Sequence, residues 1–222
     1  MDENVTAIVP AYNEGENIGD TIHSLKQIEG ITEIIAVNDG SSDNTLETLK
    51  KIVNIKILDN KLNCGKGHAI KVALPHVTNK YVLLVDADLR NSALEMKKLV
   101  NNAERLSNNM LVAIHPKPLK KGGFGLVKTL SRKSLYLLTR KSSESVLSGQ
   151  RLLNTDFLKA INLPNDFGVE FKITLEALRS NIRIVDIYTN IRHRETGRSL
   201  KGFLHRGKQF TNILKVVIKE IL

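Results

Sequence analysis

The first half of the chain alternates short apolar runs with segments whose apolar residues recur at helical spacing, and this alternation restricts the fold more than any other feature. The apolar runs cover residues 5–9, 33–37, 55–58, 81–85 and 111–114. Apolar strands separated by helices are typical of parallel sheets, whose strands are buried on both faces. The sequence therefore predicts an α/β protein with a mostly parallel sheet flanked by helices.

Helices are predicted between these runs and through most of the second half. One helix begins near Glu14, and the next is capped by Ser42 or Asp43 and extends to Val53. The remaining expected elements are helices at 67–74, 94–106, 123–140 and 168–180, a loop at 148–151, a strand at 182–187 and a final helix.

Three polar segments follow apolar runs at the point where each run ends. They are Pro10–Glu14, Asn38–Asp43 and Asp86–Asp88. In open parallel sheets, ligands bind beyond the carboxyl ends of the strands. We therefore expect these three segments to share one rim of the sheet and to form a ligand site there.

The composition is that of a soluble globular protein with a sizeable core. Apolar residues make up 41% of the chain and charged residues 25%, and no linker rich in Pro, Gly or Ser divides it, so we expect a single domain. Cys64 is the only cysteine, which excludes an intrachain disulfide and is typical of a reducing compartment. We see neither a signal peptide nor an apolar run near the ~18 residues of a membrane span, so we expect a cytoplasmic protein.

The positive charge lies in the second half of the chain. Residues 1–100 hold 11 Lys and Arg against 14 Asp and Glu, whereas residues 101–222 hold 22 against 9. Lys117 to Lys141 alone contains eight basic residues and no acidic one. Such a segment is either a solvated surface or a contact for an anionic partner, which includes nucleic acid, lipid headgroups and phosphorylated substrates.

Asp86 and Asp88 directly follow a strongly apolar strand. Two carboxylates spaced in this way at the end of a strand can both face one hard divalent cation, and such a cation can neutralise a leaving diphosphate. The alternative is that one carboxylate caps a helix and the other is solvated. The spacing alone does not decide between these interpretations.

The other rim segments each add a weak signal. PAYNE (10–14) places a turn after the first strand, VNDGSSDNT (37–45) ends the second strand at Asp39, and GKGHAI (65–70) opens a helix where Lys66 and backbone N–H groups favour a phosphate. Together with DAD (86–88), these motifs resemble family 2 glycosyltransferases of the GT-A fold. The resemblance covers roughly residues 4–115 with high specificity and residues 140–200 with lower specificity.

The resemblance implies a nucleotide-sugar donor and a divalent ion, Mg²⁺ or Mn²⁺. By this resemblance, Asp39 bonds the base, Lys66 lies near the donor, and Asp86 and Asp88 match the D-x-D pair. Asp86 is then a donor-binding residue, and Asp88 is the usual metal ligand and a catalytic residue. The segment that holds the nucleoside corresponds to Pro10, Ala11, Tyr12 and Glu14. The implied GT-A fold is a Rossmann-like sheet with a C-terminal amphipathic helix. We divide it into a nucleotide-sugar half (1–115), an acceptor half (116–198) and a basic tail (199–222).

The second half adds residues with less specific signals. LSGQRLL (147–153) resembles the sugar and acceptor loop of the family, so Gly149 and Arg151 are expected to line the site together with Gln150. Glu170 opens a helix where many inverting relatives carry a general base, and it is our candidate for that base. Its alternative role is to complement the helix dipole, and in a retaining enzyme it need not be a base.

The segment IRHRETGRS (191–199) resembles a loop of glucosyl-3-phosphoglycerate synthases and allied enzymes. The resemblance makes His193 a further metal ligand and places Arg194 and Arg198 near the donor diphosphate or an acceptor phosphate. Arginine suits such contacts because its guanidinium binds phosphate through two parallel hydrogen bonds.

The last helix is basic and amphipathic. Leu214, Val217, Ile218 and Ile221 recur at helical spacing, with lysines between them. Such a helix either packs on its own domain or a second subunit, which would make a homodimer, or lies on an anionic membrane surface. In the latter case the protein works at the inner face of the membrane.

These observations favour a metal-dependent glycosyltransferase that moves a hexose from a nucleotide-diphosphate sugar to an acceptor. A UDP-sugar such as UDP-glucose is the favoured donor, and a phosphate-bearing acceptor, either polyprenyl phosphate or a phosphoglycerate-like compound, is expected. The alternatives are a sugar-nucleotide nucleotidyltransferase and a non-enzymatic basic protein for anionic membranes or nucleic acid. Nucleic acid is disfavoured because aromatic residues are only 5% and Trp is absent.

Overall fold

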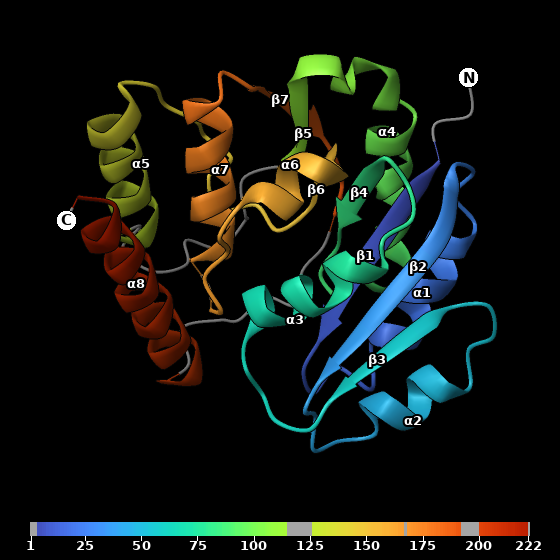
Figure 1. Ribbon diagram of the computed structural model, residues 1–222. Helices are drawn as coiled ribbons and strands as arrows, with labels where there is room; N and C mark the ends of the chain where they lie inside the picture. The colour runs from blue at the N-terminus through green and yellow to red at the C-terminus, as the bar shows by residue number, and fades with distance from the viewer. Residues whose placement is uncertain (1–3, 115–125, 167, 192–199, 222) are drawn as a thin grey trace.

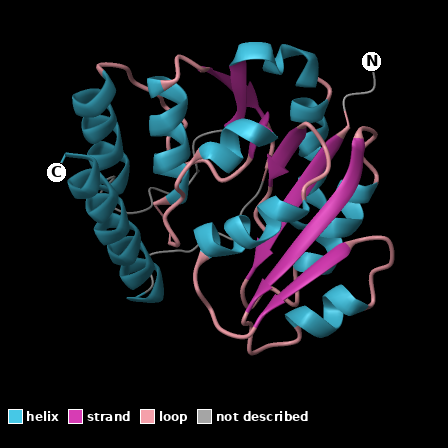
Figure 2. Cartoon of the chain, viewed as in Figure 1, coloured by secondary structure: helices cyan, strands magenta, loops and turns pink. Residues whose placement is uncertain are grey.

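A seven-stranded sheet runs through the computed structural model, which describes residues 4–114, 126–166, 168–191 and 200–221 (Figure 2). The strand order is β3-β2-β1-β4-β6-β5-β7. The strands are β1 (Val5–Ala11), β2 (Ile31–Asp39), β3 (Lys56–Asn60), β4 (Tyr81–Leu84), β5 (Asn109–Ile114), β6 (Arg151–Asn154) and β7 (Arg183–Tyr188). Strand β6 runs antiparallel to both neighbours, and the other recorded pairings are parallel.

Helices connect the strands and cover both faces of the sheet. The α-helices are α1 (Ile18–Lys26), α2 (Thr45–Lys50), α3 (Lys66–Ala73), α4 (Lys97–Val100), α5 (Leu126–Thr139), α6 (Thr155–Ala160), α7 (Val169–Arg179) and α8 (Leu200–Ile221). Short 3₁₀ helices are η1 (Leu74–His76), η2 (Arg90–Met96) and η3 (Ala103–Asn108).

Side chains that alternate along the central strands build two cores, one on each face of the sheet. In β1, Ala7 and Val9 pack with α1, η2 and α4, whereas Ile8 packs with α3, α6 and α7. Successive side chains of a strand point to opposite faces, so an entirely apolar strand is stable only when both faces are covered. This burial explains why the strands consist of continuous apolar runs.

Helices α5, α7 and α8 gather at one side of the molecule and enclose a third core (Figure 1). Leu135 of α5, Phe171 of α7 and Ile213 of α8 are buried there. Glu220 of α8 also pairs with Lys172 and Arg179 of α7. Across the described ranges, no helix is both long enough and apolar enough to cross a membrane.

The sequence patterns misplaced several boundaries. Helix α2 ends at Lys50 rather than Val53, whose side chain is 71% exposed, and its N-cap is Asn44. Asp43 instead accepts hydrogen bonds from the backbone N–H groups of Thr45 and Gly15. The helix expected at 94–106 is divided among η2, α4 and η3.

The largest difference in the second half concerns Arg151, which was expected in a loop and begins strand β6. Its four-residue strand pairs with β4 and β5 through backbone hydrogen bonds. Such pairing depends on strands distant in sequence, and four residues are too few to show a period. Helix α6 follows directly and was not predicted.

Candidate active site

The loops after β1 and β2 are tied together at the carboxyl edge of the sheet. Asn13 accepts a hydrogen bond from the Ser42 N–H through Oδ1 at 2.8 Å, and the Glu14 N–H donates to Thr45 Oγ1 at 2.9 Å. Burial by itself would raise the pKa of Asp43, but hydrogen bonds from Thr45 and Gly15 bring it below its usual value. The two loops thus form one fixed wall of the rim.

The predicted nucleoside segment lies on this wall. Pro10 and Ala11 end β1, and Ala11 is buried. Tyr12 follows with its side chain 48% exposed, and Glu14 accepts a hydrogen bond from Asn17 Nδ2 at 2.5 Å. The exposed ring of Tyr12 provides an apolar surface of the kind that can pack against a ligand at the rim.

Asp39 is almost fully buried at the end of β2 and organises the segment that leads into α3. Its carboxylate accepts hydrogen bonds from Asn60 Nδ2 at 2.9 Å, from the Cys64 N–H at 3.2 Å and from the Gly65 N–H at 2.8 Å. Gly65 has φ +98°, a conformation that glycine adopts without strain. Asp39 therefore fixes the start of the helix that carries Lys66.

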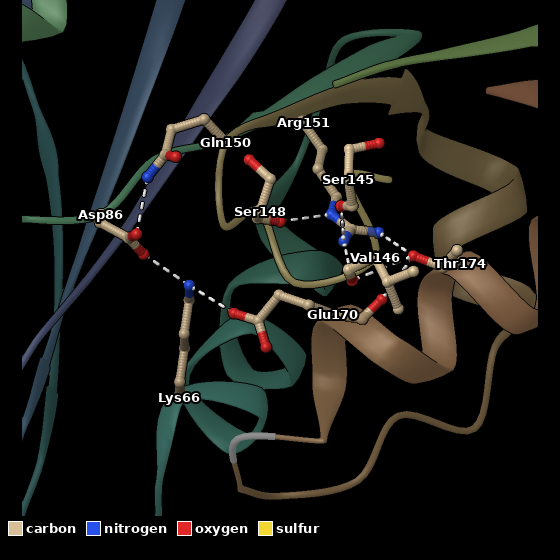
Figure 3. Close-up of polar contacts among 9 residues, drawn as sticks. All are labelled: Lys66, Asp86, Ser145, Val146, Ser148, Gln150, Arg151, Glu170 and Thr174. Atoms are coloured by element: carbon tan, nitrogen blue, oxygen red, sulfur yellow. Dashed lines mark hydrogen bonds and ion pairs between the residues drawn. The ribbon is translucent and has the colours of Figure 1, made fainter. Parts of the chain in front are cut away.

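Lys66 connects the two halves of the chain (Figure 3). Its Nζ lies 2.5 Å from Asp86 Oδ1 at the end of β4 and 2.6 Å from Glu170 Oε1 in the first turn of α7. Burial by itself would lower the pKa of Lys66, but the charges of Asp86 and Glu170 raise it above its ordinary value. Lys66 is therefore a fixed positive charge between two carboxylates.

The loop before β6 lies directly against this ion pair. Gln150 donates through Nε2 to Asp86 Oδ2 at 2.6 Å, and its Oε1 is buried without a hydrogen-bond partner. A Cβ at Gly149 would lie 2.5 Å from Asp86 Oδ2 and 2.8 Å from Lys66 Nζ. Only glycine allows the backbone to approach the charged groups so closely.

Arg151 is also in this region, but its guanidinium is directed into the protein. The side chain is fully buried, and it donates to the carbonyl oxygens of Ser148 and Val146 and to the hydroxyl of Thr174 (Figure 3). The sequence predicts that Arg151 contacts the nucleotide-sugar. In the structure, the N–H groups of its guanidinium instead bind oxygens of the preceding loop and of Thr174. The sequence offers no signal for Thr174, whose partner is 23 residues away.

The described residues fit the predicted metal site in part. Asp86 and Asp88 are half-buried at the end of β4, and their oxygens are of the type that Mg²⁺ and Mn²⁺ prefer. Among the described residues no group of three His, Cys, Asp or Glu side chains could hold a metal ion. The predicted residues His193, Arg194 and Arg198 lie outside the described residues.

Sequence comparison relates most of the chain to one family. The model of glycosyl transferase family 2 matches residues 6–160. An uncharacterized protein of Methanocaldococcus jannaschii is 26% identical over 97% of this chain and 98% of its own length. The undecaprenyl-phosphate 4-deoxy-4-formamido-L-arabinose transferase of Proteus mirabilis is 37% identical over 45% of this chain and 33% of its own length.

Other relatives extend the comparison. The dolichyl-phosphate beta-glucosyltransferase of Trichomonas vaginalis is 37% identical over 50% of this chain and 38% of its own length. The matched part of this chain thus spans about a third of the length of these two named relatives. The structure of glucosyl-3-phosphoglycerate synthase from Mycobacterium tuberculosis, in complex with Mn²⁺, UDP and phosphoglyceric acid, superposes with a TM-score of 0.80 at 20% identity. The superposition covers 98% of this chain and 78% of the synthase chain. This likeness confirms the GT-A fold.

Proposed function

The chain belongs to glycosyl transferase family 2, and we propose that it transfers a hexose from a nucleotide-diphosphate sugar to a phosphate-bearing acceptor. UDP-glucose is the favoured donor. The observation that carries the proposal is the cluster of Lys66, Asp86 and Glu170, which stands where the carboxyl ends of the parallel strands meet. A fold of this class binds its ligands at that edge.

The donor is proposed to lie along the rim. Its nucleoside contacts the wall that holds Tyr12 and Glu14, its base is bonded by Asp39, and its diphosphate lies beside Lys66. Related folds support this choice, since solved structures of glucosyl-3-phosphoglycerate synthase contain UDP or UDP-glucose. The Lys66 ammonium contributes a positive charge where negative charge develops on the departing diphosphate.

Asp88 and Asp86 are proposed to hold Mg²⁺ or Mn²⁺, and His193 is the further expected ligand. The ion would neutralise charge on the diphosphate. This chain's own residues would bind and orient the reactants. Gly149 and Gln150 keep Asp86 in place, and Asp88 is the proposed metal ligand at the end of β4. Arg194 and Arg198 are proposed phosphate contacts.

Glu170 remains our candidate for the general base. A base accepts the proton of the acceptor as the new bond to the sugar forms. The ion pair with Lys66, at 2.6 Å, holds the Glu170 side chain in the first turn of α7, at the edge of the cluster where an acceptor hydroxyl would have to lie. Replacement by Gln keeps the shape of the side chain and removes its ability to accept that proton.

Polyprenyl phosphate is the favoured acceptor class, and a phosphoglycerate-like compound is the second candidate. Relatives named for undecaprenyl phosphate and dolichyl phosphate support the first, and a solved structure with phosphoglyceric acid supports the second. The first candidate also agrees with the surface of α8, where Leu214, Ile218 and Ile221 are exposed beside lysines. We propose that this face contacts an anionic membrane, at its cytoplasmic side.

The test of donor binding is calorimetric titration with UDP, GDP and their sugars, with Mn²⁺, with Mg²⁺ and with a chelator. Metal-dependent binding of UDP or UDP-glucose is expected. Asp88→Ala should abolish transfer with the fold intact, whereas Asp156→Ala, which removes an exposed carboxylate of α6, should transfer as the wild type does. Normal transfer by Asp88→Ala would refute its assignment.

Acceptor assays then separate the remaining possibilities. Transfer to a polyprenyl phosphate and not to 3-phosphoglycerate supports the first candidate, and the reverse result supports the second. Release of diphosphate during synthesis of a nucleotide-sugar would instead indicate a nucleotidyltransferase. For the membrane contact, Ile218→Glu should weaken sedimentation with anionic liposomes, whereas Val53→Glu, at an exposed residue outside α8, should not.

A further inference from the structure

Arg151 is a buried cation whose hydrogen bonds all hold main-chain segments or a hydroxyl. Its Nε donates to Ser148 O at 2.7 Å, its Nη2 to Val146 O at 2.6 Å and Ser145 O at 3.4 Å, and its Nη1 to Thr174 Oγ1 at 2.7 Å (Figure 3). Within the parts of the chain that the structure describes, no carboxylate lies within ion-pair distance of it. The hydrogen-bond partners of Arg151 are therefore neutral oxygens, and what they share is that they belong to two chain segments that the guanidinium joins.

Burial of this guanidinium is unfavourable by itself. Burial lowers the pKa of Arg151 to about 10, although Glu170, Asp86 and Asp186 act in the opposite direction through their charges. The side chain thus stays charged at neutral pH inside the protein. An apolar side chain of similar volume would avoid the desolvation that a buried cation costs. What arginine provides here, and an apolar side chain does not, is a planar group of N–H donors that binds several oxygens at once.

The loop that Arg151 holds is the one that encloses the Lys66–Asp86 ion pair. Its next residues are Gly149, whose backbone lies against both charged groups, and Gln150, which donates to Asp86 at 2.6 Å. The carbonyl bonds of Arg151 fix residues 145–148 immediately before them. A change in these bonds therefore shifts the groups that set the position of Asp86.

Thr174 connects the same guanidinium to the main chain of Glu170, whose side chain is the other carboxylate beside Lys66. The Thr174 hydroxyl accepts from Arg151 Nη1 and donates to the carbonyl oxygen of Glu170 at 2.8 Å, one helical turn earlier in α7. Arg151 is thus linked to the segments that carry both carboxylates facing Lys66: the loop whose Gln150 binds Asp86, and the first turn of α7, which carries Glu170 (Figure 3).

We propose that Arg151 is a positioning residue that sets the separation of Asp86 and Glu170 around Lys66 by joining the 145–150 loop to α7, without itself contacting the donor. The inference rests on the proposed function for its activity readout alone. It assigns to Arg151 a mechanical role in place of the donor contact that its motif suggests.

The first test removes the hydroxyl that Arg151 binds. Thr174→Val keeps the charge of the arginine and the volume of the threonine. Its matched control is Thr155→Val, at a buried threonine that donates to Asn79 O at 2.8 Å beyond the opposite end of β6. Because a 1 Å misplacement costs ~100-fold in rate, Thr174→Val should lower kcat at saturating donor about tenfold or more. Equal activity of the two variants, at equal Tm, would overturn the proposal.

The second test separates position from charge. Arg151→Lys retains a positive charge but cannot bind the loop and α7 together, and Arg151→Met removes the charge at similar volume. The proposal expects transfer to be lost to a similar extent in both. Transfer by Arg151→Lys at the wild-type rate would show that charge alone suffices and would overturn it. If these variants do not fold, Thr174→Val answers the question.

The third readout does not depend on activity. The Gln150 side-chain amide, assigned through its absence in Gln150→Met, should give a ¹⁵N–¹H signal typical of a bond to a carboxylate. This signal should move in Thr174→Val and stay in place in Thr155→Val. An unmoved signal in Thr174→Val contradicts the positioning role. Absence of donor binding by the wild-type protein would instead count against the proposed function and leave this readout valid.

Discussion

Replacing Lys66 by methionine is the perturbation that most directly tests the electrostatics of the site. The ammonium lies 2.5 Å from Asp86 and 2.6 Å from Glu170, and the exposed fractions of the three side chains are 17%, 27% and 12%. Methionine keeps the apolar stem and removes the charge. Asp86 and Glu170 are then largely buried, close to each other and deprived of the ammonium that both of them contact.

The expected cost follows from this burial. Removing one partner of a buried ion pair costs ~3–5 kcal/mol, and the partial exposure of Asp86 places the value near the lower end, at about 3 kcal/mol. For a chain of this size each kcal/mol corresponds to a shift of ~2–4 °C, so Tm should fall by about 6–12 °C. Because the pKa of Lys66 is raised, its stabilising charge is present at all pH values below its unfolded value of ~10.4 and is lost only as the pH rises through the folded value.

The measurement is thermal unfolding at pH 7 without metal, repeated with excess Mn²⁺. A divalent ion near Asp86 replaces part of the lost positive charge, so Mn²⁺ should raise the Tm of Lys66→Met more than that of the wild type. The matched control is Lys71→Met in the same helix, where the ammonium bonds the side-chain amide of Asn165. A Tm of Lys66→Met within about 1 °C of the Tm of Lys71→Met would refute the reasoning.

Two further predictions concern packing and the docking of the last helix. Gly149→Ala should reduce transfer strongly, because its Cβ would lie 2.5 Å from Asp86 Oδ2, whereas Gly19→Ala, whose Cβ would lie 3.4 Å from Thr48 Cγ2, should keep full activity in the same assay. Burial by itself would raise the pKa of Glu220, but hydrogen bonds from Lys172 and Arg179 bring it below its ordinary value. The stabilisation that Glu220 contributes is therefore present above ~pH 4.3 and lost as the pH falls through the folded pKa. Glu220→Gln should therefore lower the free energy of unfolding by about 2 kcal/mol at pH 7 in urea titrations, with a difference that vanishes in acid; an equal difference at pH 3 would contradict this account.

The parts of the fold that the sequence predicts are those with a strong local pattern. Strands β1, β2, β4 and β5 are apolar runs that are buried on both faces, and the runs mark them clearly. Strand β6 was not predicted, because its four residues are extended through pairing with β4 and β5, which lie far away in sequence. The segment 94–106 carries apolar residues at helical spacing but divides into short 3₁₀ and α turns.

The same distinction applies to the site. The motifs at the rim predicted that Lys66 and Asp86 both serve the nucleotide-sugar donor, and the structure brings the two side chains into contact. The contact between Lys66 and Glu170 joins residues 104 positions apart, and no local pattern indicates it. The assigned roles of Asp39, Asp88 and Glu170 toward ligands stay predictions. The orientation of Arg151 depends on packing in the interior, which a motif in a loop does not reveal.

The place of β6 in the sheet also bears on how the chain acquires its structure during synthesis. Strands β1 to β4 are complete by Leu84 and already pair with one another, so the first layer can form early. Strand β5 is made next but has its sheet neighbours in β6 and β7, which follow tens of residues later. Contacts between distant segments form slowly, and unpaired strands are prone to aggregate. Nascent chains that stop before Asn154 should therefore carry an unprotected β5, and β5 gains both of its sheet neighbours only when β7 has also been made.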